Sequence, residues 1–90
     1  MTSVQYLSDL ALQVLARRAM RREQVPRHAP DETRERAGTR APCAICDDPI
    51  RPDQVEIEMR FCPDRGCAII TVYPVHAPCL WIWQAERPAA

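Results

Sequence analysis

Two short pairs of metal-ligating residues stand out in the second half of the chain. Cys43 and Cys46 form a C-x2-C pair, and His76 and Cys79 form an H-x2-C pair. Zinc prefers thiolate and imidazole ligands in a closed tetrahedron, and a pair of ligands two residues apart can bind one ion from a tight turn. Each pair alone is a weak signal, but together they supply four ligands. The sequence therefore predicts one structural Zn²⁺ held by these four residues.

A structural role for the zinc is favoured over a catalytic one. A catalytic zinc keeps an open position for water, whereas the four predicted ligands fill the site. The sequence has no Ser/His/Asp set and no glycine-rich phosphate loop, and it contains only 2 Gly. Cys62 or Cys67 as a nucleophile would need a base, and none is near them in the sequence. We expect that the chain is not an enzyme.

The residues between the two ligand pairs predict a β-hairpin. Residues 55–61 alternate apolar and charged, the period of a half-buried strand. Residues 63–66 (Pro-Asp-Arg-Gly) suit a turn, and residues 68–73 resume as a strand that Pro74 would end. With Cys62 opposite Cys67, one apolar face would hold the pairs Phe61–Ala68, Met59–Ile70 and Ile57–Val72.

A short helix is predicted over 79–86, with Pro78 at its start and Pro88 after its end. A knuckle, a hairpin and a helix whose first turn supplies the last ligands are the layout of a treble clef. The predicted class is therefore a small α+β, zinc-stabilised module over 43–90. Three fates remain open for Cys62 and Cys67: free, redox-sensitive thiols, a disulfide, or ligands of a second metal.

The first part of the chain predicts an amphipathic helix within 1–25, followed by a polar linker over 26–42 rich in Pro and Arg. The helix would span 4–23, capped by Thr2 or Ser3. It would either fold back on the zinc module or pair with another copy as a homodimer. Its apolar stripe would be Val4, Leu7, Leu10, Ala11, Val14 and Leu15, and four arginines crowd its end: Arg17, Arg18, Arg21 and Arg22.

Length, charge and hydropathy limit the function classes. A chain of 90 residues buries a marginal core, so a metal or disulfides are expected to support it. The net charge is 0, which argues against non-specific coating of nucleic acid. No stretch of the sequence approaches the roughly 18–20 apolar residues of a membrane span, and no secretory signal is evident. We expect a cytoplasmic protein.

The residues around the ligands resemble the first-site half of a RING finger. Cys43-Ala-Ile-Cys46 is similar to the opening of that family, and residues 76–83 resemble its H-x2-C-[I/L]-x2-W stretch. The resemblance implies that Ile45 and Trp83 form part of a groove for a ubiquitin-conjugating enzyme. It covers about half of a RING finger, because no C-x2-C pair follows Trp83. LIM domains share a C-x2-C…H-x2-C unit, but with a shorter insert.

The leading functional hypothesis is a protein-interaction adaptor or regulator whose partner the sequence does not identify. Trp81 and Trp83 lie two residues apart on a short helix, so they cannot share one face. An exposed Trp is a typical interface anchor. One alternative is a nucleic-acid-binding zinc finger that uses the four arginines at the end of the first helix. Another is a degenerate RING-like module in ubiquitin transfer.

Overall fold

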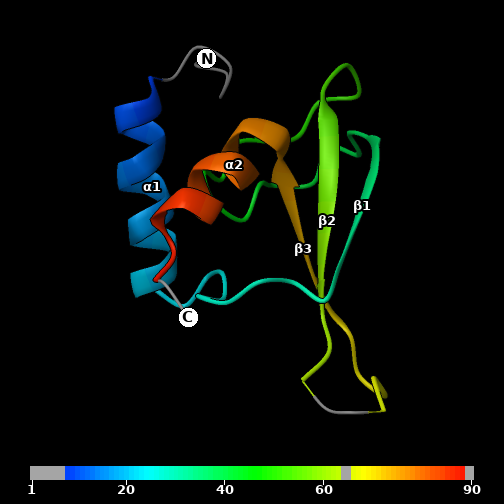
Figure 1. The fold of residues 1–90 in the computed structure, drawn as a ribbon. Helices are drawn as coiled ribbons and strands as arrows, with labels where there is room; N and C mark the ends of the chain where they lie inside the picture. The colour runs from blue at the N-terminus through cyan, green and yellow to red at the C-terminus, as the bar shows by residue number, and fades with distance from the viewer. Residues whose placement is uncertain (1–7, 64–65, 89–90) are drawn as a thin grey trace.

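The described part of the chain folds into two helices and a three-stranded antiparallel sheet (Figure 1). A computed structural model describes residues 8–63 and 66–88. The predicted α+β class is confirmed. In chain order the elements are α1 (Asp9–Arg21), β1 (Glu32–Ala37), β2 (Val55–Phe61), β3 (Thr71–His76) and α2 (Ala77–Glu86).

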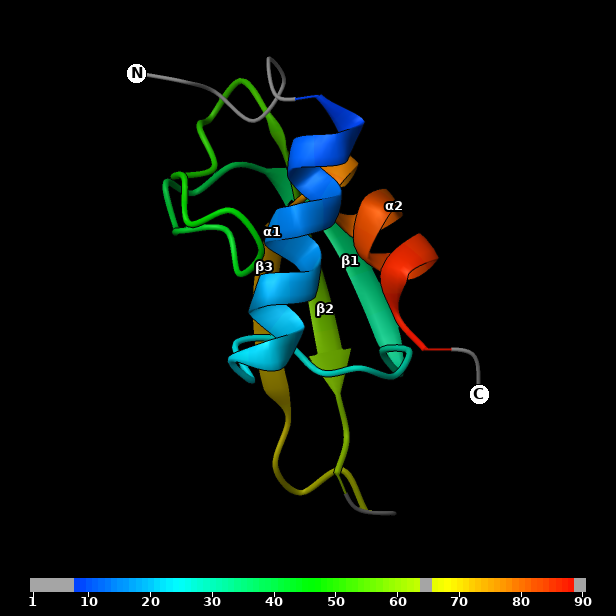
Figure 2. The same ribbon diagram turned by 90° about the vertical axis from the view of Figure 1, so that its left-hand side faces the viewer.

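The elements form three layers. The sheet has the strand order β1-β2-β3; α2 lies against β2 and β3, and α1 packs on α2 (Figures 1 and 2). Apolar side chains from all three layers join into one core, in which Trp83 and Met59 are fully buried. Neither helix in the described part of the chain is long and apolar enough to cross a bilayer.

Helix α1 folds back on the rest of the chain, which was one of the two predicted fates. It begins at Asp9, where the Ser8 side chain accepts a hydrogen bond from the Ala11 amide at 3.2 Å. The predicted caps Thr2 and Ser3 lie outside the described residues. The predicted stripe was partly wrong, because Leu10 and Val14 are exposed. The buried positions of α1 are Leu12, Ala16, Ala19 and Met20.

The predicted hairpin exists, but its predicted register was wrong. Ile57 lies opposite Val75 instead of Val72, so β3 is shifted by three residues along the chain. An odd shift turns the strand over, because successive side chains point to opposite faces. Val75 therefore joins the core, while Ile70 and Val72 are exposed.

Pro74 does not end the second strand, contrary to the prediction. It lies opposite Glu58 within β3, which is an edge strand of the sheet. The Pro74 carbonyl accepts a hydrogen bond from the Ala44 amide at 2.8 Å, so the backbone groups of Pro74 point away from β2. The missing N–H of the proline therefore removes no hydrogen bond between β2 and β3. The strand continues to His76, which brings this ligand to the start of α2.

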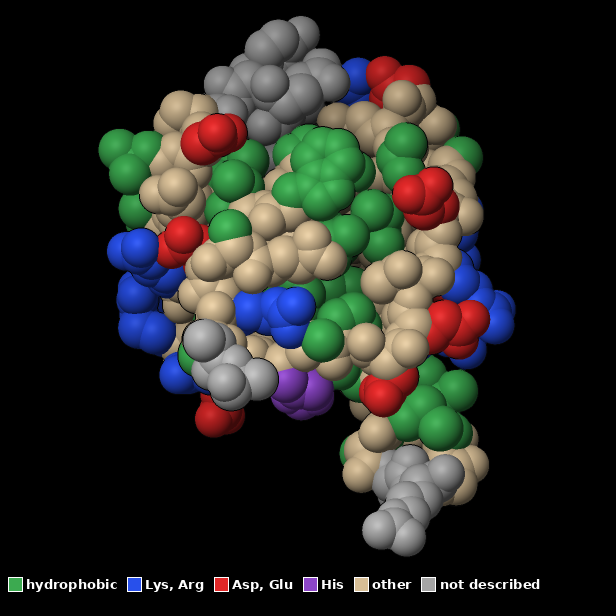
Figure 3. Space-filling view, viewed as in Figure 1, with side chains coloured by type: hydrophobic (Ala, Val, Ile, Leu, Met, Phe, Trp, Pro, Cys, Tyr) green, Lys and Arg blue, Asp and Glu red, His purple; other side chains and the backbone are tan. Residues whose placement is uncertain are grey.

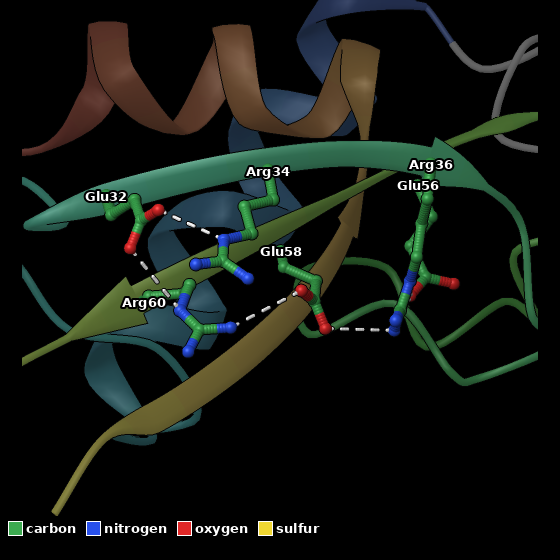
Figure 4. A network of polar contacts seen from close by, with 6 residues as sticks. All are labelled: Glu32, Arg34, Arg36, Glu56, Glu58 and Arg60. Carbon is green, nitrogen blue, oxygen red and sulfur yellow. Dashed lines mark hydrogen bonds and ion pairs between the residues drawn. The ribbon is translucent and has the colours of Figure 1, made fainter.

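The region predicted as a linker contains a strand. All six residues of β1 are exposed, so it has no apolar pattern that would have predicted it. Its charges instead match those of β2, because Glu32 lies opposite Arg60 and Arg34 lies opposite Glu58 (Figure 4). Opposite charges at directly facing positions stabilise an antiparallel pair. Backbone pairing and charge complementarity, rather than burial, hold this edge strand.

Glu56 is a buried carboxylate at the end of this charged ladder. It is 0% exposed, and its oxygens accept hydrogen bonds from the Thr39 amide and hydroxyl at 3.0 and 2.7 Å. Arg36, directly opposite, donates to it at 2.6 and 2.9 Å. Desolvation raises the pKa of Glu56, but the hydrogen bonds from Thr39 and Arg36 outweigh it and lower the pKa below its ordinary 4.5.

Replacing Glu56 by Ala is expected to lower the free energy of unfolding by about 3 kcal/mol, because Arg36 and Thr39 lose their buried acceptor. Urea unfolding of the metal-loaded chain measures this loss. The pKa is lowered in the folded state, so the difference from wild type is present above pH 4.5 and shrinks as the pH falls through the folded-state pKa. Glu35→Ala, an exposed glutamate of β1, is the control. Equal effects of the two substitutions would contradict this account.

Candidate metal centre

The structure brings the four predicted ligands together. One ligand atom each from Cys43, Cys46, His76 and Cys79 lies within 4.8 Å of all the others. Three of the four residues are almost completely buried, and Cys46 is half-buried. The two pairs come from distant parts of the sequence, so the core packs around their meeting point. This arrangement can hold a metal ion.

The Cys43–Cys46 pair lies on a tight turn. The Asp47 amide donates to the Cys43 carbonyl and the Cys43 amide donates to the Asp48 carbonyl, both at 2.9 Å. Asp47 has a φ of 68°, a left-handed conformation that Asp tolerates better than most residues. The Ile45 amide points at the Cys43 sulfur, 3.4 Å away, where it would stabilise a thiolate. The turn therefore aims both sulfurs at one point.

A hydrogen bond between its second ring nitrogen and Gln54 orients His76. Its Nδ1 lies 3.5 Å from the Cys46 sulfur, and its Nε2 lies 3.2 Å from Gln54 Oε1. An amide oxygen can only accept, so this contact places the proton on Nε2 and leaves the Nδ1 lone pair for a metal. The same Gln54 oxygen accepts from the Arg51 amide at 2.8 Å. Gln54 is a positioning residue that no sequence motif marked.

Gly38 allows the segment that carries Gln54 to approach closely. A Cβ at residue 38 would lie 1.9 Å from the Arg51 carbonyl oxygen, so only glycine fits here. The Gly38 amide also donates to the Gln54 carbonyl at 2.9 Å. The end of β1 and the start of β2 are thereby clamped together beside His76. The support for the metal ligand thus extends into the region predicted as a linker.

The three clustered sulfurs strongly affect one another's protonation. Hydrogen bonds from the Cys46 and Cys79 thiols lower the pKa of Cys43 far below its ordinary 9.0. The same contacts with Cys43 raise the pKa of Cys46 to about 12 and also raise that of Cys79. Three sulfurs this close cannot all be thiolates without a balancing positive charge. A divalent cation would replace the thiol protons and satisfy all three sulfurs.

No family model, curated protein or solved structure matches this chain. In the geometry of the cluster, the thiolates and the imidazole fit a metal that prefers sulfur and nitrogen donors. The remaining predicted site residues are placed by the same structure.

The partner-binding residues taken from the RING resemblance do not all reach the surface. Ile45 is 3% exposed and Trp83 is 0% exposed, so the prediction that both line a groove for a partner was wrong. Trp83 packs in the core, and its indole N–H donates to the Pro26 carbonyl at 3.1 Å. Trp81 is 64% exposed. The expectation that the two tryptophans face opposite ways is confirmed.

The other predicted residues lie outside the metal cluster. Cys62 and Cys67 form a disulfide with their Cα atoms 4.9 Å apart, which selects one of the three predicted fates. The Cys62 amide donates to Asp31 Oδ2 at 2.6 Å, so the disulfide-closed loop is also tied to the segment before β1. The four predicted arginines, Arg17, Arg18, Arg21 and Arg22, are all exposed.

Cys43→Ser is expected to weaken metal binding more than about 100-fold, since loss of a residue that only hydrogen-bonds to a metal ligand already costs about 10–100-fold. Without the metal, residues 43–86 should lose their dispersed amide signals, because the turn, β3 and α2 are no longer joined. A metal titration followed by ¹H–¹⁵N NMR measures both effects. The double variant Cys62→Ser/Cys67→Ser is the control and should keep the metal. A dispersed spectrum for Cys43→Ser would refute the assignment.

Proposed function

We propose that the chain is a small zinc-stabilised protein-interaction module. The supporting observation is the buried cluster of Cys43, Cys46, His76 and Cys79 beside an exposed tryptophan. Three thiolates and one imidazole are a common donor set of structural zinc, and four protein ligands leave no position for a reacting water. We therefore infer a binding role rather than a catalytic one.

We also propose that the zinc module is a treble clef. The knuckle at residues 43–46 lies beside the edge of the sheet, where the Ala44 amide donates to Pro74. Strands β2 and β3 form the hairpin, and His76 and Cys79 flank the first residues of α2. This order is similar to the first-site half of a RING finger. Ubiquitin transfer is not supported, because the two groove positions implied by that family are buried in this chain.

The proposed interface is the surface around Trp81. This side chain lines a shallow pocket of about 260 Å³ together with Val55, Ala77 and Pro78. Val55 is 49% exposed, so the pocket offers two large apolar side chains to a partner. An apolar patch is visible over the first turns of α2 (Figure 3). Exposed Trp in an apolar pocket is typical of an interface anchor.

The metal would hold this interface in shape. His76 directly precedes α2, Cys79 lies in its first turn, and Trp81 follows two residues later. The backbone that carries Trp81 is therefore fixed at its start by two ligands. A rigid anchor loses little conformational freedom when a partner binds. Zinc in this proposal contributes to affinity through preorganisation, without contacting the partner.

Nucleic-acid binding is a second candidate function. One observation favours it: Arg17, Arg18, Arg21 and Arg22 are exposed together at the end of α1, away from the charged ladder of the sheet. Arginine contacts to phosphates make binding strongly dependent on salt. Binding of a duplex or single strand that weakens steeply between low and physiological salt would support this candidate.

Trp81→Ala is expected to reduce capture of protein partners from an extract of the source cells about 30-fold, the effect of losing an anchor worth about 2 kcal/mol. Its melting temperature should stay near that of wild type, because the side chain is exposed. Quantitative mass spectrometry of the captured proteins measures the loss. Val14→Ala, a large apolar residue exposed on α1, is the control and should capture normally. Equal capture by all three proteins would contradict the proposed interface.

A further inference from the structure

Arginine side chains gather at one end of the molecule, where both helices end. On the face shown in Figure 3, they lie beside the C-terminal ends of α1 and α2. A pocket of about 270 Å³ opens there. It lies apart from the metal cluster, and none of its lining residues belongs to the Trp81 surface. The residues that line it are Arg17, Met20, Arg21, Arg27, Glu86 and Pro88.

The pocket carries an excess of positive charge. Arg17 forms an ion pair with Glu86, the one carboxylate of the lining, and so joins the end of α1 to the end of α2. Arg21 lies one helical turn after Arg17 on the same face of α1. Arg27 comes from the segment after the helix, and its guanidinium makes a long contact of 3.5 Å to the Met20 carbonyl. The guanidinium groups of Arg21 and Arg27 therefore have no further carboxylate to neutralise them among the lining residues.

Arg87 lies between the lining residues Glu86 and Pro88 in the sequence but is not part of the lining, and its guanidinium stacks 5.2 Å from the centre of the Trp83 ring. Its buried Nε has no hydrogen-bond partner among the described residues. An anion that binds between Arg21 and Arg27 would relieve the repulsion between their positive charges. The planar fork of arginine fits the oxygens of a phosphate by paired hydrogen bonds.

We propose that Arg17, Arg21 and Arg27 form a binding pocket for a phosphate group. Arg21 and Arg27 donate to the phosphate oxygens, and the pairing of Arg17 with Glu86 fixes the two helix ends that frame them. The ligand is either free phosphate or a phosphate of a nucleic-acid backbone. In the latter case the inference rests on the second candidate function and gives it a defined contact point.

The test compares two neighbouring arginines. Arg21 lines the pocket, whereas Arg22 is exposed and lies outside it, so Arg21→Gln and Arg22→Gln remove the same charge from adjacent positions. Inorganic phosphate is titrated into the metal-loaded full chain at constant ionic strength, with the arginine Nε–Hε signals followed by NMR. We expect saturable shifts in wild type. Arg21→Gln should weaken binding about tenfold, and Arg22→Gln less than about twofold.

The proposal is overturned if phosphate causes no saturable shift, or if both variants weaken binding equally, because the arginines would then act only as diffuse charge. A second titration uses a short single-stranded oligonucleotide. A selective loss in Arg21→Gln identifies a backbone phosphate as the ligand, and absence of oligonucleotide binding beside phosphate binding that depends on Arg21 identifies free phosphate. Oligonucleotide binding that is steeply salt-dependent and equal in both variants, with no saturable phosphate shift, would overturn the pocket and leave the second candidate function standing. Melting curves of both variants confirm that they fold.

Discussion

The convergence of four ligand atoms is the constraint on which the rest of the structure depends. A turn, the last residue of an edge strand and the first turn of a helix must meet at one point, with all four atoms within 4.8 Å. A chain of 90 residues has little core with which to fix such elements by packing alone. Metal binding supplies folding free energy directly, because the site does not exist in the unfolded chain. A metal ion bound at this cluster would therefore act as part of the core.

Several features of the fold follow from this convergence. Strand β3 continues through Pro74 to His76, and the odd register shift puts Val75 rather than Val72 into the core. The knuckle then lies against the outer edge of β3, where its Ala44 amide finds the Pro74 carbonyl. Helix α2 starts directly after the ligand His76 and can bury Trp83 while it exposes Trp81. The ligand geometry thereby determines which tryptophan is exposed.

The two faces of the sheet are held by different forces. One face packs against α2 through apolar side chains such as Ile57 and Met59. The other carries a ladder of facing Arg and Glu residues that ends at the buried Glu56 (Figure 4). A buried carboxylate is tolerated only when its hydrogen bonds are complete, so Glu56 specifies the partners Arg36 and Thr39. An edge strand without a buried residue is thus attached in a defined register.

The sequence was sufficient to predict what depends on residue type and short spacing. The four ligands, the α+β class, the apolar face of β2 and the helix after Pro78 all follow from local patterns. The register of β3 could not be predicted, because a turn at residues 63–66 and a closed loop ending at residue 70 are both compatible with the local sequence. Strand β1 was missed because its stability comes from charges on a distant strand. The role of Gln54 was missed for a similar reason, because it depends on a contact with His76, which is distant in the sequence.

The resemblance to a family was misleading where its pattern was carried over without its packing. It assigned Ile45 and Trp83 to a partner-binding groove, but in this chain the core encloses both residues. Helix α1 likewise buries Leu12 and Ala16 instead of the stripe that includes Leu10. Which face of an amphipathic helix is buried depends on the surface that receives it, and that surface is formed only by the tertiary fold.

The most direct test of the central claim is the zinc stoichiometry of the purified chain, measured by native mass spectrometry before and after chelation. The account predicts one zinc ion per chain, lost together with the compact charge states when a chelator is added, while the Cys62–Cys67 disulfide remains. A compact chain that binds no zinc, or a fold that survives its removal unchanged, would contradict the claim that the four-ligand cluster holds the module together.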